Sequence, residues 1–264
     1  MPESFNESGP GPDSQPPCLL IPAAGGNLAG QLIGRLQRGG FPVSSDQAEW
    51  LQAPRRAVWL LPNLPDQLPP LPGCELIIDS RPLPPALAIA LASDAAKLGM
   101  RYLDLAVQDS PFAALHGYAM AVGGSHAVAS FARPWLDCLA PIRGGWWHCG
   151  EAGAASFVTS LLGQWQGSLA QALQISSAWL SNPASVMAGI TALHGRHQVL
   201  LNTLATMAAQ YLASTEGEVF SGEVYPSQLL AGLPSFDAPA TDSPARRLAR
   251  FLVWLGNQGM TRPA

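Results

Sequence analysis

Residues 18–37 read CLLIPAAGGNLAGQLIGRLQ: a short apolar run, a turn of small residues, and a segment with apolar residues at helical spacing. A strand, a glycine turn and a helix in this order form the unit in which backbone amides at a helix N-terminus approach a pyrophosphate. Of the usual G-x-G-x-x-G spacing, Gly26 keeps the middle glycine, while Ala24 and Ala29 replace the outer two. Alanine packs closely but disfavours the positive φ that glycine adopts. A tight turn without a ligand is the competing interpretation.

The same alternation of short apolar runs and helix-like segments continues through the first half of the chain. The predicted strands are 18–22, 57–61, 75–79, 102–107 and 118–123, and the predicted helices between them are 28–37, 83–98 and 127–139. Strands that alternate with helices form βαβ units and a mostly parallel sheet.

The second half of the chain has helical spacing only. Predicted helices cover 152–172, 185–212 and 243–257, and residues 215–239, rich in Gly, Pro and Ser, are predicted to form a long loop. Residues 192–212 are apolar on more than one side, so we expect this helix to be buried or to lie in an interface. The sequence therefore predicts a disordered tail at 1–17, an α/β domain at 18–149 and an all-α domain at 150–264.

Composition limits the classes of function. The formal net charge is −4, which argues against a nucleic-acid-binding protein because such a protein presents a basic face. No apolar run approaches the ~20 residues that span a bilayer, and the first residues do not resemble a signal peptide. The four cysteines form no C-x-x-C pair. We expect a soluble, reduced, cytoplasmic protein that binds neither nucleic acid nor a membrane.

Asp46 lies about where a dinucleotide-binding unit places the acidic residue that contacts the ribose 2′-OH. It also follows two serines and precedes a short helix-like segment, 47–52, which makes it a good N-cap. We favour the cap.

Two groups of reactive side chains admit both a functional and a structural interpretation. His194 and His197 share a helix face, but no third ligand accompanies them, so we favour solvated histidines over a metal site. His148 and Cys149 are adjacent in a segment of the strand type. A Cys–His nucleophile pair is the minor alternative there, because neighbouring residues of a strand point to opposite faces.

Two glycine-rich segments carry a family resemblance. Residues 116–124, HGYAMAVGG, are close to "R-G-Y-x-L-M-x-G-G", and residues 145–158, GWWHCGEAGAASFV, are close to "G-Y-x-H-x-G-x-x-G-A-G-H-F-V". On these segments the chain resembles the NADP-dependent 6-phosphogluconate dehydrogenases, especially their short bacterial form, within the β-hydroxyacid dehydrogenase superfamily. The resemblance covers about residues 18 to 260. Weaker matches are found at 54–62, 75–79, 98–107 and 255–258.

The resemblance implies a Rossmann-like NAD(P)-binding domain, shortened here, followed by an all-α domain. Between Asp46 and Ala57 the chain is too short for a strand and a helix that the family places on the adenosine side of the sheet. The residues that the resemblance would place beside NADP or NAD are Ala24, Gly26, Asn27, Leu28 and Pro62. We therefore expect dinucleotide binding to be weak or absent.

The positions that carry the family's chemistry are changed. Thr159 stands where the family has its catalytic lysine, Leu162-Gly163 where it has a His-Asn pair, and Gln166-Gly167 where it has a Glu-Tyr pair. Lys97, the only lysine of the chain, is far away in sequence. The family's substrate loop corresponds to 108–110, its "D-G-G-N-S" to 79–83, and its tail arginine to Gly256.

Two hypotheses follow. The first is a non-catalytic or repurposed homologue, without 6-phosphogluconate dehydrogenase activity, that acts by binding a nucleotide or a protein partner. The second is an NAD(P)-dependent oxidoreductase for a less charged substrate, using Asp109, His116 or Thr159. Since 48% of the residues are hydrophobic and only 12% charged, we also expect a homodimer or a protein partner bound through the all-α half.

Overall fold

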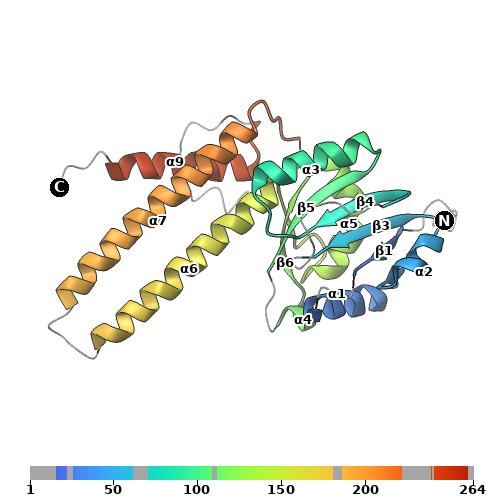
Figure 1. The fold of residues 1–264 in the computed structure, drawn as a ribbon, viewed down its shortest axis with the longest axis horizontal. Helices are drawn as coiled ribbons and strands as arrows, with labels where there is room; N and C mark the ends of the chain where they lie inside the picture. Colours follow the sequence, from blue (N-terminus) through green and yellow to red (C-terminus); the bar gives the residue numbers. More distant parts are fainter. Residues whose placement is uncertain are drawn as a thin grey trace, which may run out of the picture.

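The computed structural model describes residues 16–22, 26–61, 71–108, 112–180, 186–221, 239 and 241–260, and for 171–180, 186–190 and 258–260 the backbone alone. A sheet covered by helices on both faces forms one half of the molecule, and a bundle of long helices extends from it as an arm (Figure 1). Among the described residues, no helix combines the length and the apolar character needed to cross a membrane.

The sheet has seven strands in the order β2-β1-β3-β4-β5-β6-β7. Their bounds are β1 Cys18–Leu20, β2 Val43–Ser44, β3 Arg56–Leu60, β4 Cys74–Asp79, β5 Arg101–Gln108, β6 Ala119–Gly123 and β7 Trp147–Gly150. Every pairing is parallel except that of β5 with β6. The C-terminal ends of strands β1 to β5 therefore lie on one side of the sheet, and β6 and β7 begin on that side.

Helices cover the two faces of the sheet because alternate strand residues point to opposite sides. In β3, Ala57 and Trp59 enter a core with α1 (Gly26–Arg38) and α5 (His126–Leu139). Val58 and Leu60 enter the opposite core, with α2 (Gln47–Gln52) and α3 (Pro85–Lys97). Both faces are apolar, as expected for a parallel sheet between two helical layers.

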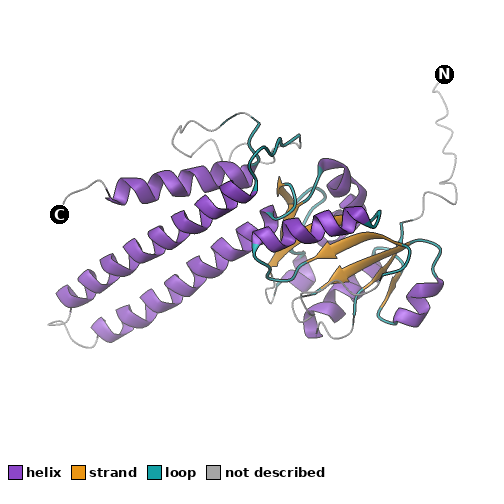
Figure 2. Ribbon diagram, turned by 45° about the horizontal axis from the view of Figure 1, so that its top comes forward, coloured by secondary structure: helices purple, strands orange, loops and turns teal. Residues whose placement is uncertain are grey.

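The arm of long helices is seen from another side in Figure 2, and a third core joins its base to β6 and β7. The arm consists of α6 (Ala154–Leu180), α7 (Val186–Ser214) and α9 (Pro244–Met260). The rings of Phe157 in α6 and Tyr211 in α7 stack with centroids 4.3 Å apart, which joins the two helices near the sheet. Leu204 and Ala208 are buried, whereas Val199 is 65% exposed, so the apolar helix predicted at 192–212 is buried only in its C-terminal part.

The predicted α/β half followed by an all-α half is confirmed, and each predicted strand and helix is present. Three short elements were not predicted: β2, β7 and α4 (Ala113–His116). β2 has only two residues and forms the edge of the sheet, in agreement with the strand–helix unit missing after Asp46. Nearly all of the tail 1–17 and most of the loop 215–239 lie outside the described residues, and the division into separate domains stays a prediction.

Candidate functional site

A pocket of about 500 Å³ lies at the C-terminal end of β5, between the ends of the strands and α6. Ligands of open α/β sheets bind at the carboxyl ends of the strands. We call it the α6 pocket. Its lining residues come from the end of β5, the starts of β6 and β7, and one face of α6: Ala106, Val107, Gln108, Ala119, Met120, Ala121, Trp147, Val158, Thr159, Leu162, Gly163 and Gln166. The structure thus brings Thr159 and Gln166 together at one pocket.

The described lining of the α6 pocket contains no ionisable side chain. The hydroxyl of Thr159 donates a hydrogen bond of 2.9 Å to the Ala155 carbonyl one turn earlier in α6, so its proton is engaged in the helix. Gln108 and Gln166 are exposed amides. Asp109 lies outside the described residues, and His116, exposed at the end of α4, does not line this pocket. Neither a general base nor a general acid is present among the described groups.

The N-terminus of α1 is where the resemblance would place the pyrophosphate of a dinucleotide. Gly26 has φ +66°, and a methyl group added there would meet no atom of the described residues within 4 Å, so the described backbone at this point is open. Asn27 is exposed and Leu28 is half-buried against the core of the sheet. Ala24 and Pro62 lie outside the described residues. These features suit a pyrophosphate at the helix N-terminus.

On the side where the adenosine would lie, the acidic side chain of Asp46 is engaged in a helix cap. The Asp46 carboxylate accepts a hydrogen bond of 2.8 Å from the Ala48 backbone N–H and caps α2, which confirms the cap. Ser44 donates to Glu49 over 2.6 Å and closes the same turn. Asp46 is thus engaged in the cap, and β2 has only two residues.

A buried ionic group at the end of β4 was not predicted from the sequence. Asp79 pairs with Arg81 at 2.6 Å and accepts a hydrogen bond of 2.9 Å from the Tyr102 hydroxyl. Burial, with the neighbouring Asp79, raises the pKa of Tyr102, so the phenol stays protonated. Because Asp79 neutralises the Arg81 guanidinium, Arg81 cannot replace the missing anion-binding side chains of the family.

Asp104 in β5 joins the sheet to α6. Its carboxylate is buried and accepts hydrogen bonds from the backbone N–H groups of Gly153 (3.1 Å) and Ser156 (2.8 Å) at the start of α6. Burial raises the pKa of Asp104 to about 6, although these hydrogen bonds oppose the shift. A Cβ at Gly123 would lie 2.1 Å from Asp104 Oδ1, so the glycine makes room for the carboxylate. The signal for this role was an aspartate in the middle of an apolar strand.

Gly256, at the position of the family's tail arginine, is a contact between helices. A Cβ there would lie 2.6 Å from the Ala205 Cβ of α7. A side chain at this position would therefore push α9 away from α7.

His148 and Cys149 do not form a nucleophile pair. His148 Nε2 lies 2.7 Å from the Gly124 carbonyl oxygen, and burial lowers the pKa of this histidine. The Cys149 thiol is fully buried, donates to the Val122 carbonyl over 3.1 Å, and has a pKa raised by burial. His194 and His197 are exposed on α7, and no group of three metal-ligating side chains occurs in the described part of the chain.

Comparison with known proteins places only the fold. No family model and no curated protein matches the sequence. Among solved structures, the chain is similar to an imine reductase from Myxococcus stipitatus in complex with NADP+ (20% identity, 93% of this chain and 94% of that chain, TM-score 0.47). It is also similar to a 3-hydroxyisobutyrate dehydrogenase from Mycobacterium tuberculosis with L-serine (18%, 95% and 89%, 0.47).

A 3-hydroxyisobutyrate dehydrogenase from Salmonella typhimurium is similar as well (14% identity, 92% of this chain and 94% of that chain, TM-score 0.46). These are structures of the β-hydroxyacid dehydrogenase superfamily, and none of the three is a 6-phosphogluconate dehydrogenase. The fold of this chain is Rossmann-like with a helical C-terminal part. The narrower resemblance to 6-phosphogluconate dehydrogenases stays a prediction.

Proposed function

We propose that this chain is a 6-phosphogluconate dehydrogenase-like protein that lacks the family's activity, a non-catalytic or repurposed homologue that acts by binding. The observation that carries the proposal is the α6 pocket, whose described lining holds no ionisable group. By the resemblance, that pocket should hold the base that accepts the substrate hydroxyl proton and the acid that protonates the enediol. Thr159 and Gln166 occupy those positions and supply neither.

A phosphosugar acid is a poor ligand for this pocket. It carries a phosphate and a carboxylate, and burying either anion without a paired donor costs on the order of several kcal/mol. Met120, Trp147 and Leu162 line the pocket with apolar surface instead. The pocket suits a small, uncharged ligand.

The open backbone at Gly26 supports binding of a pyrophosphate group, with Asn27 and Leu28 beside it. When bound, NADP or NAD would supply hydride transfer. The engaged Asp46 and the two-residue β2 argue for weak affinity, so we propose weak or absent dinucleotide binding, to be measured by calorimetry with NADP and NAD.

The alternative function is an NAD(P)-dependent oxidoreductase for a less charged substrate. The apolar lining of the α6 pocket favours it, because such a substrate would be desolvated there at low cost. Of the three side chains proposed for this chemistry, Thr159 lines the pocket and His116 does not.

Gly163 and Gly167 provide a matched test of both functions. Both lie on α6 with no atom within 4 Å of an added Cβ, but only Gly163 lines the pocket. Hydride transfer from NADPH to a panel of neutral carbonyl and imine compounds would be measured for the wild type, Gly163→Phe and Gly167→Phe. No turnover in any of them supports the binding protein. Turnover that is lost in Gly163→Phe and retained in Gly167→Phe supports the oxidoreductase and refutes the first proposal.

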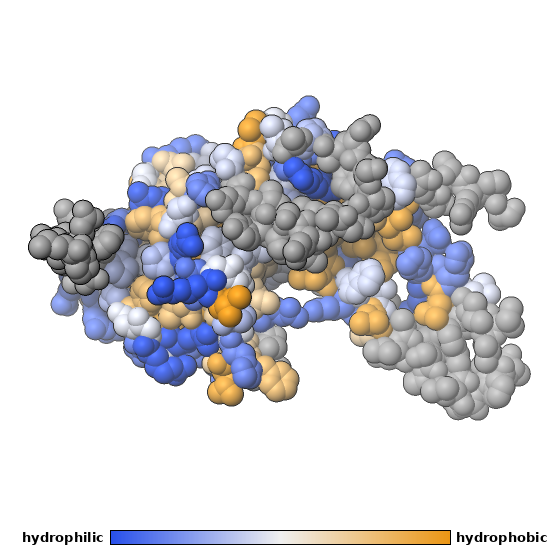
Figure 3. Space-filling model, turned by 180° about the vertical axis from the view of Figure 1, so that it is seen from behind, coloured by the Kyte–Doolittle hydropathy of each residue, from blue (hydrophilic) through white to orange (hydrophobic). Residues whose placement is uncertain are grey.

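We also propose a homodimer, or a tight complex with another protein, through the helical half. Apolar side chains are exposed on the arm, and Figure 3 shows apolar patches there among polar residues. They are Leu162, Trp165, Leu169, Val199 and Trp254, each between 42% and 65% exposed. Obligate interfaces bury on the order of 2,000 Å² or more and are apolar. Sedimentation that shows a monomer at micromolar concentration, with no partner recovered from cells, would refute this.

A further inference from the structure

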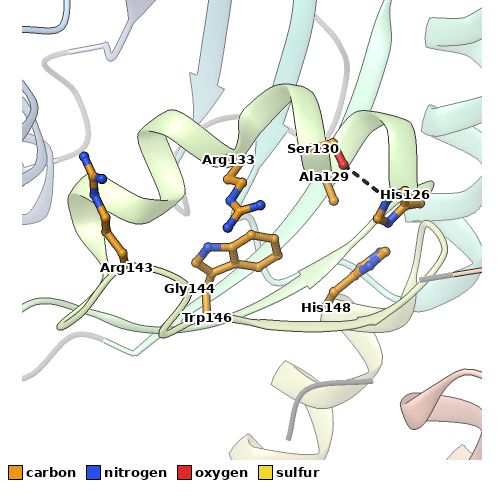
Figure 4. A pocket seen from close by; sticks show the side chains of 8 residues that line it. All are labelled: His126, Ala129, Ser130, Arg133, Arg143, Gly144, Trp146 and His148. Carbon is orange, nitrogen blue, oxygen red and sulfur yellow. Dashed lines mark hydrogen bonds between the residues drawn. The ribbon is translucent and has the colours of Figure 1, made fainter. Parts of the chain in front are cut away.

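A second pocket, of about 320 Å³, lies on the opposite face of β7, between that strand and α5. Trp147 lines the α6 pocket, whereas its neighbours Trp146 and His148 point the other way, as alternate strand residues do (Figure 4). His126, Ala129, Ser130 and Arg133 of α5 and Arg143 and Gly144 of the preceding loop complete the lining. We call it the α5 pocket. It is separate from the open backbone at Gly26, since no residue of α1 lines it.

The α5 pocket is positively charged in an acidic protein. Arg133 and Arg143 both line it, and its lining contains no carboxylate. The nearest acid identified by contacts is Asp137, which accepts hydrogen bonds from the Trp146 indole N–H (2.8 Å) and the Gly144 N–H (2.9 Å) and a longer one of 3.4 Å from Arg133. Burial alone would raise the pKa of Asp137, but these hydrogen bonds outweigh it and lower the pKa. Asp137 therefore stays charged and organises the wall.

A third, more open pocket of about 540 Å³ adjoins the α5 pocket. Ser130, Arg133 and Arg143 line both of them. Both arginines line the boundary between the two pockets. Asp137 lines the third pocket with them, so the α5 pocket, whose lining has no carboxylate, is the side open to an anionic ligand. Two guanidinium groups match a dianion better than a single carboxylate.

The rest of the wall is aromatic and held in place. Trp146 is fixed through its N–H on Asp137, and its indole lines the pocket. His148 is fixed by its contact with the Gly124 carbonyl and by the Phe220 ring, whose centroid lies 4.9 Å away, edge to face. His126 lies beside it, with centroids 6.3 Å apart. Rings fixed in this way offer stacking surface without loss of side-chain entropy on binding.

We propose that the α5 pocket binds a small aromatic phosphomonoester. Arg143 and Arg133, the latter shared with Asp137 at 3.4 Å, hold the phosphate. Ser130, whose hydroxyl oxygen lies 3.5 Å from His126 Nε2, turns that hydroxyl to the phosphate on binding, and the aromatic ring packs against Trp146 and His148. The site stands independently of the proposed function, because it shares no residue with the α6 pocket or with α1.

Phenyl phosphate is the probe, titrated into the full chain by calorimetry at fixed, low ionic strength. Phenol tests the ring without the anion, inorganic phosphate the anion without the ring, and benzoate the carboxylate in place of the phosphate. We expect saturable binding of phenyl phosphate, about tenfold or more tighter than that of the other three, which corresponds to at least 1.4 kcal/mol. Equal or tighter binding of benzoate or of inorganic phosphate would overturn the proposal.

The double variant Arg133→Gln/Arg143→Gln locates the site. We expect it to weaken phenyl phosphate binding at least tenfold while its melting temperature stays close to that of the wild type, because both side chains are exposed. The matched control is Arg196→Gln. Arg196 is an exposed residue of α7 that lines neither the α5 pocket, the α6 pocket nor the third pocket. Binding that is unchanged in the double variant, or weakened as much in the control, would overturn the proposal, as would no binding to the wild type.

Discussion

The first turn of α6 and the face of α6 that follows it differ sharply in how their residues are constrained. Residues 153–158 are all buried, and the first turn is capped by the buried Asp104. Residues 162–167 are all exposed, and a Cβ added at Gly163 or Gly167 would have open space around it among the described residues. The first region belongs to the glycine-rich segments that carry the family resemblance, and the second holds positions where that resemblance would place the family's catalytic groups.

This difference shows what a resemblance in glycine-rich segments establishes. Gly123 leaves room for Asp104, and Gly153, with φ +92°, would place a Cβ 2.9 Å from the Pro85 carbonyl oxygen. These glycines are required for α6 to leave the sheet at the observed angle. They specify the junction and hence the fold, but they do not specify the chemistry of the pocket that begins one turn later.

The largest expected effect is on activity. We expect no oxidation of 6-phosphogluconate by the purified protein, since a general base and a general acid, each contributing ~10²–10⁴-fold, are both missing. Thr159→Lys alone should not restore the reaction, because catalytic groups act as a unit. NADPH absorbance at high protein concentration measures it. Turnover at ordinary enzyme rates, ~1–10³ s⁻¹, would mean that the resemblance is misaligned at this pocket and that other side chains act there.

Gly123→Ala tests the constrained region. The added methyl group would lie 2.1 Å from Asp104 Oδ1 and 2.9 Å from the Ala155 backbone nitrogen, and neither atom can move without breaking the cap of α6. We expect a loss of about 3 kcal/mol or more in the free energy of unfolding, measured by urea titration. A loss below about 1 kcal/mol would show that the junction is more plastic than its packing indicates.

Asp104→Asn tests the same junction through pH. The pKa of Asp104 rises to about 6 in the folded protein from its ordinary value of 3.8, so ionisation disfavours folding. Its stabilising contribution is complete below about pH 4 and declines as the pH rises through about 6. The free energy of unfolding of the wild type minus that of Asp104→Asn should therefore fall by up to about 3 kcal/mol between pH 4 and 7.

The subtraction is needed because other carboxyl groups act in the opposite direction. Asp137 and Asp242, whose pKa values are lowered in the folded protein, lose their stabilising contribution as the pH falls. Both proteins contain them, so their contributions cancel in the difference. A difference that stays constant from pH 4 to 7 would contradict the raised pKa of Asp104.

The sequence predicted the elements that rest on hydrophobic periodicity. The alternation of apolar strands and helices gave the parallel part of the sheet, and helical spacing after Glu151 gave the arm. β2 was not predicted because two residues show no hydrophobic periodicity, and α4 was not predicted because a single helical turn shows little more. β7 was not counted among the predicted strands because it has only four residues, Trp147–Gly150, although its strand character was used to argue against a His148–Cys149 pair.

The site was predicted in part. The resemblance placed Thr159 and Gln166, and the structure shows both at one pocket. Interactions between residues distant in sequence could not be read from it: the contact of Asp104 with the start of α6, 49 and 52 positions away, and the contact of Tyr102 with Asp79, 23 away. An N-cap such as Asp46 was predictable because its partner lies two residues along the chain. Local hydrogen bonds leave a signature in sequence, and long-range ones do not.

The smallest expected effect tests the unconstrained region directly. Gly163 lies in the interior of α6, and an added Cβ would meet no atom within 4 Å. Gly163→Ala should therefore stabilise the protein by about 0.5–1 kcal/mol, because alanine loses less backbone entropy than glycine on entering a helix. Urea titration of both variants should show a loss of unfolding free energy for Gly123→Ala and a gain for Gly163→Ala. The same glycine-to-alanine change would then have opposite effects in the constrained and the unconstrained region. Destabilisation by Gly163→Ala would mean that something packs on this face of α6, either a second copy of the chain or residues of the same chain. Sedimentation at the concentration of the titration would then distinguish a dimer, which the exposed Leu162 and Trp165 already favour, from a monomer whose pocket is more closely filled than the structure shows.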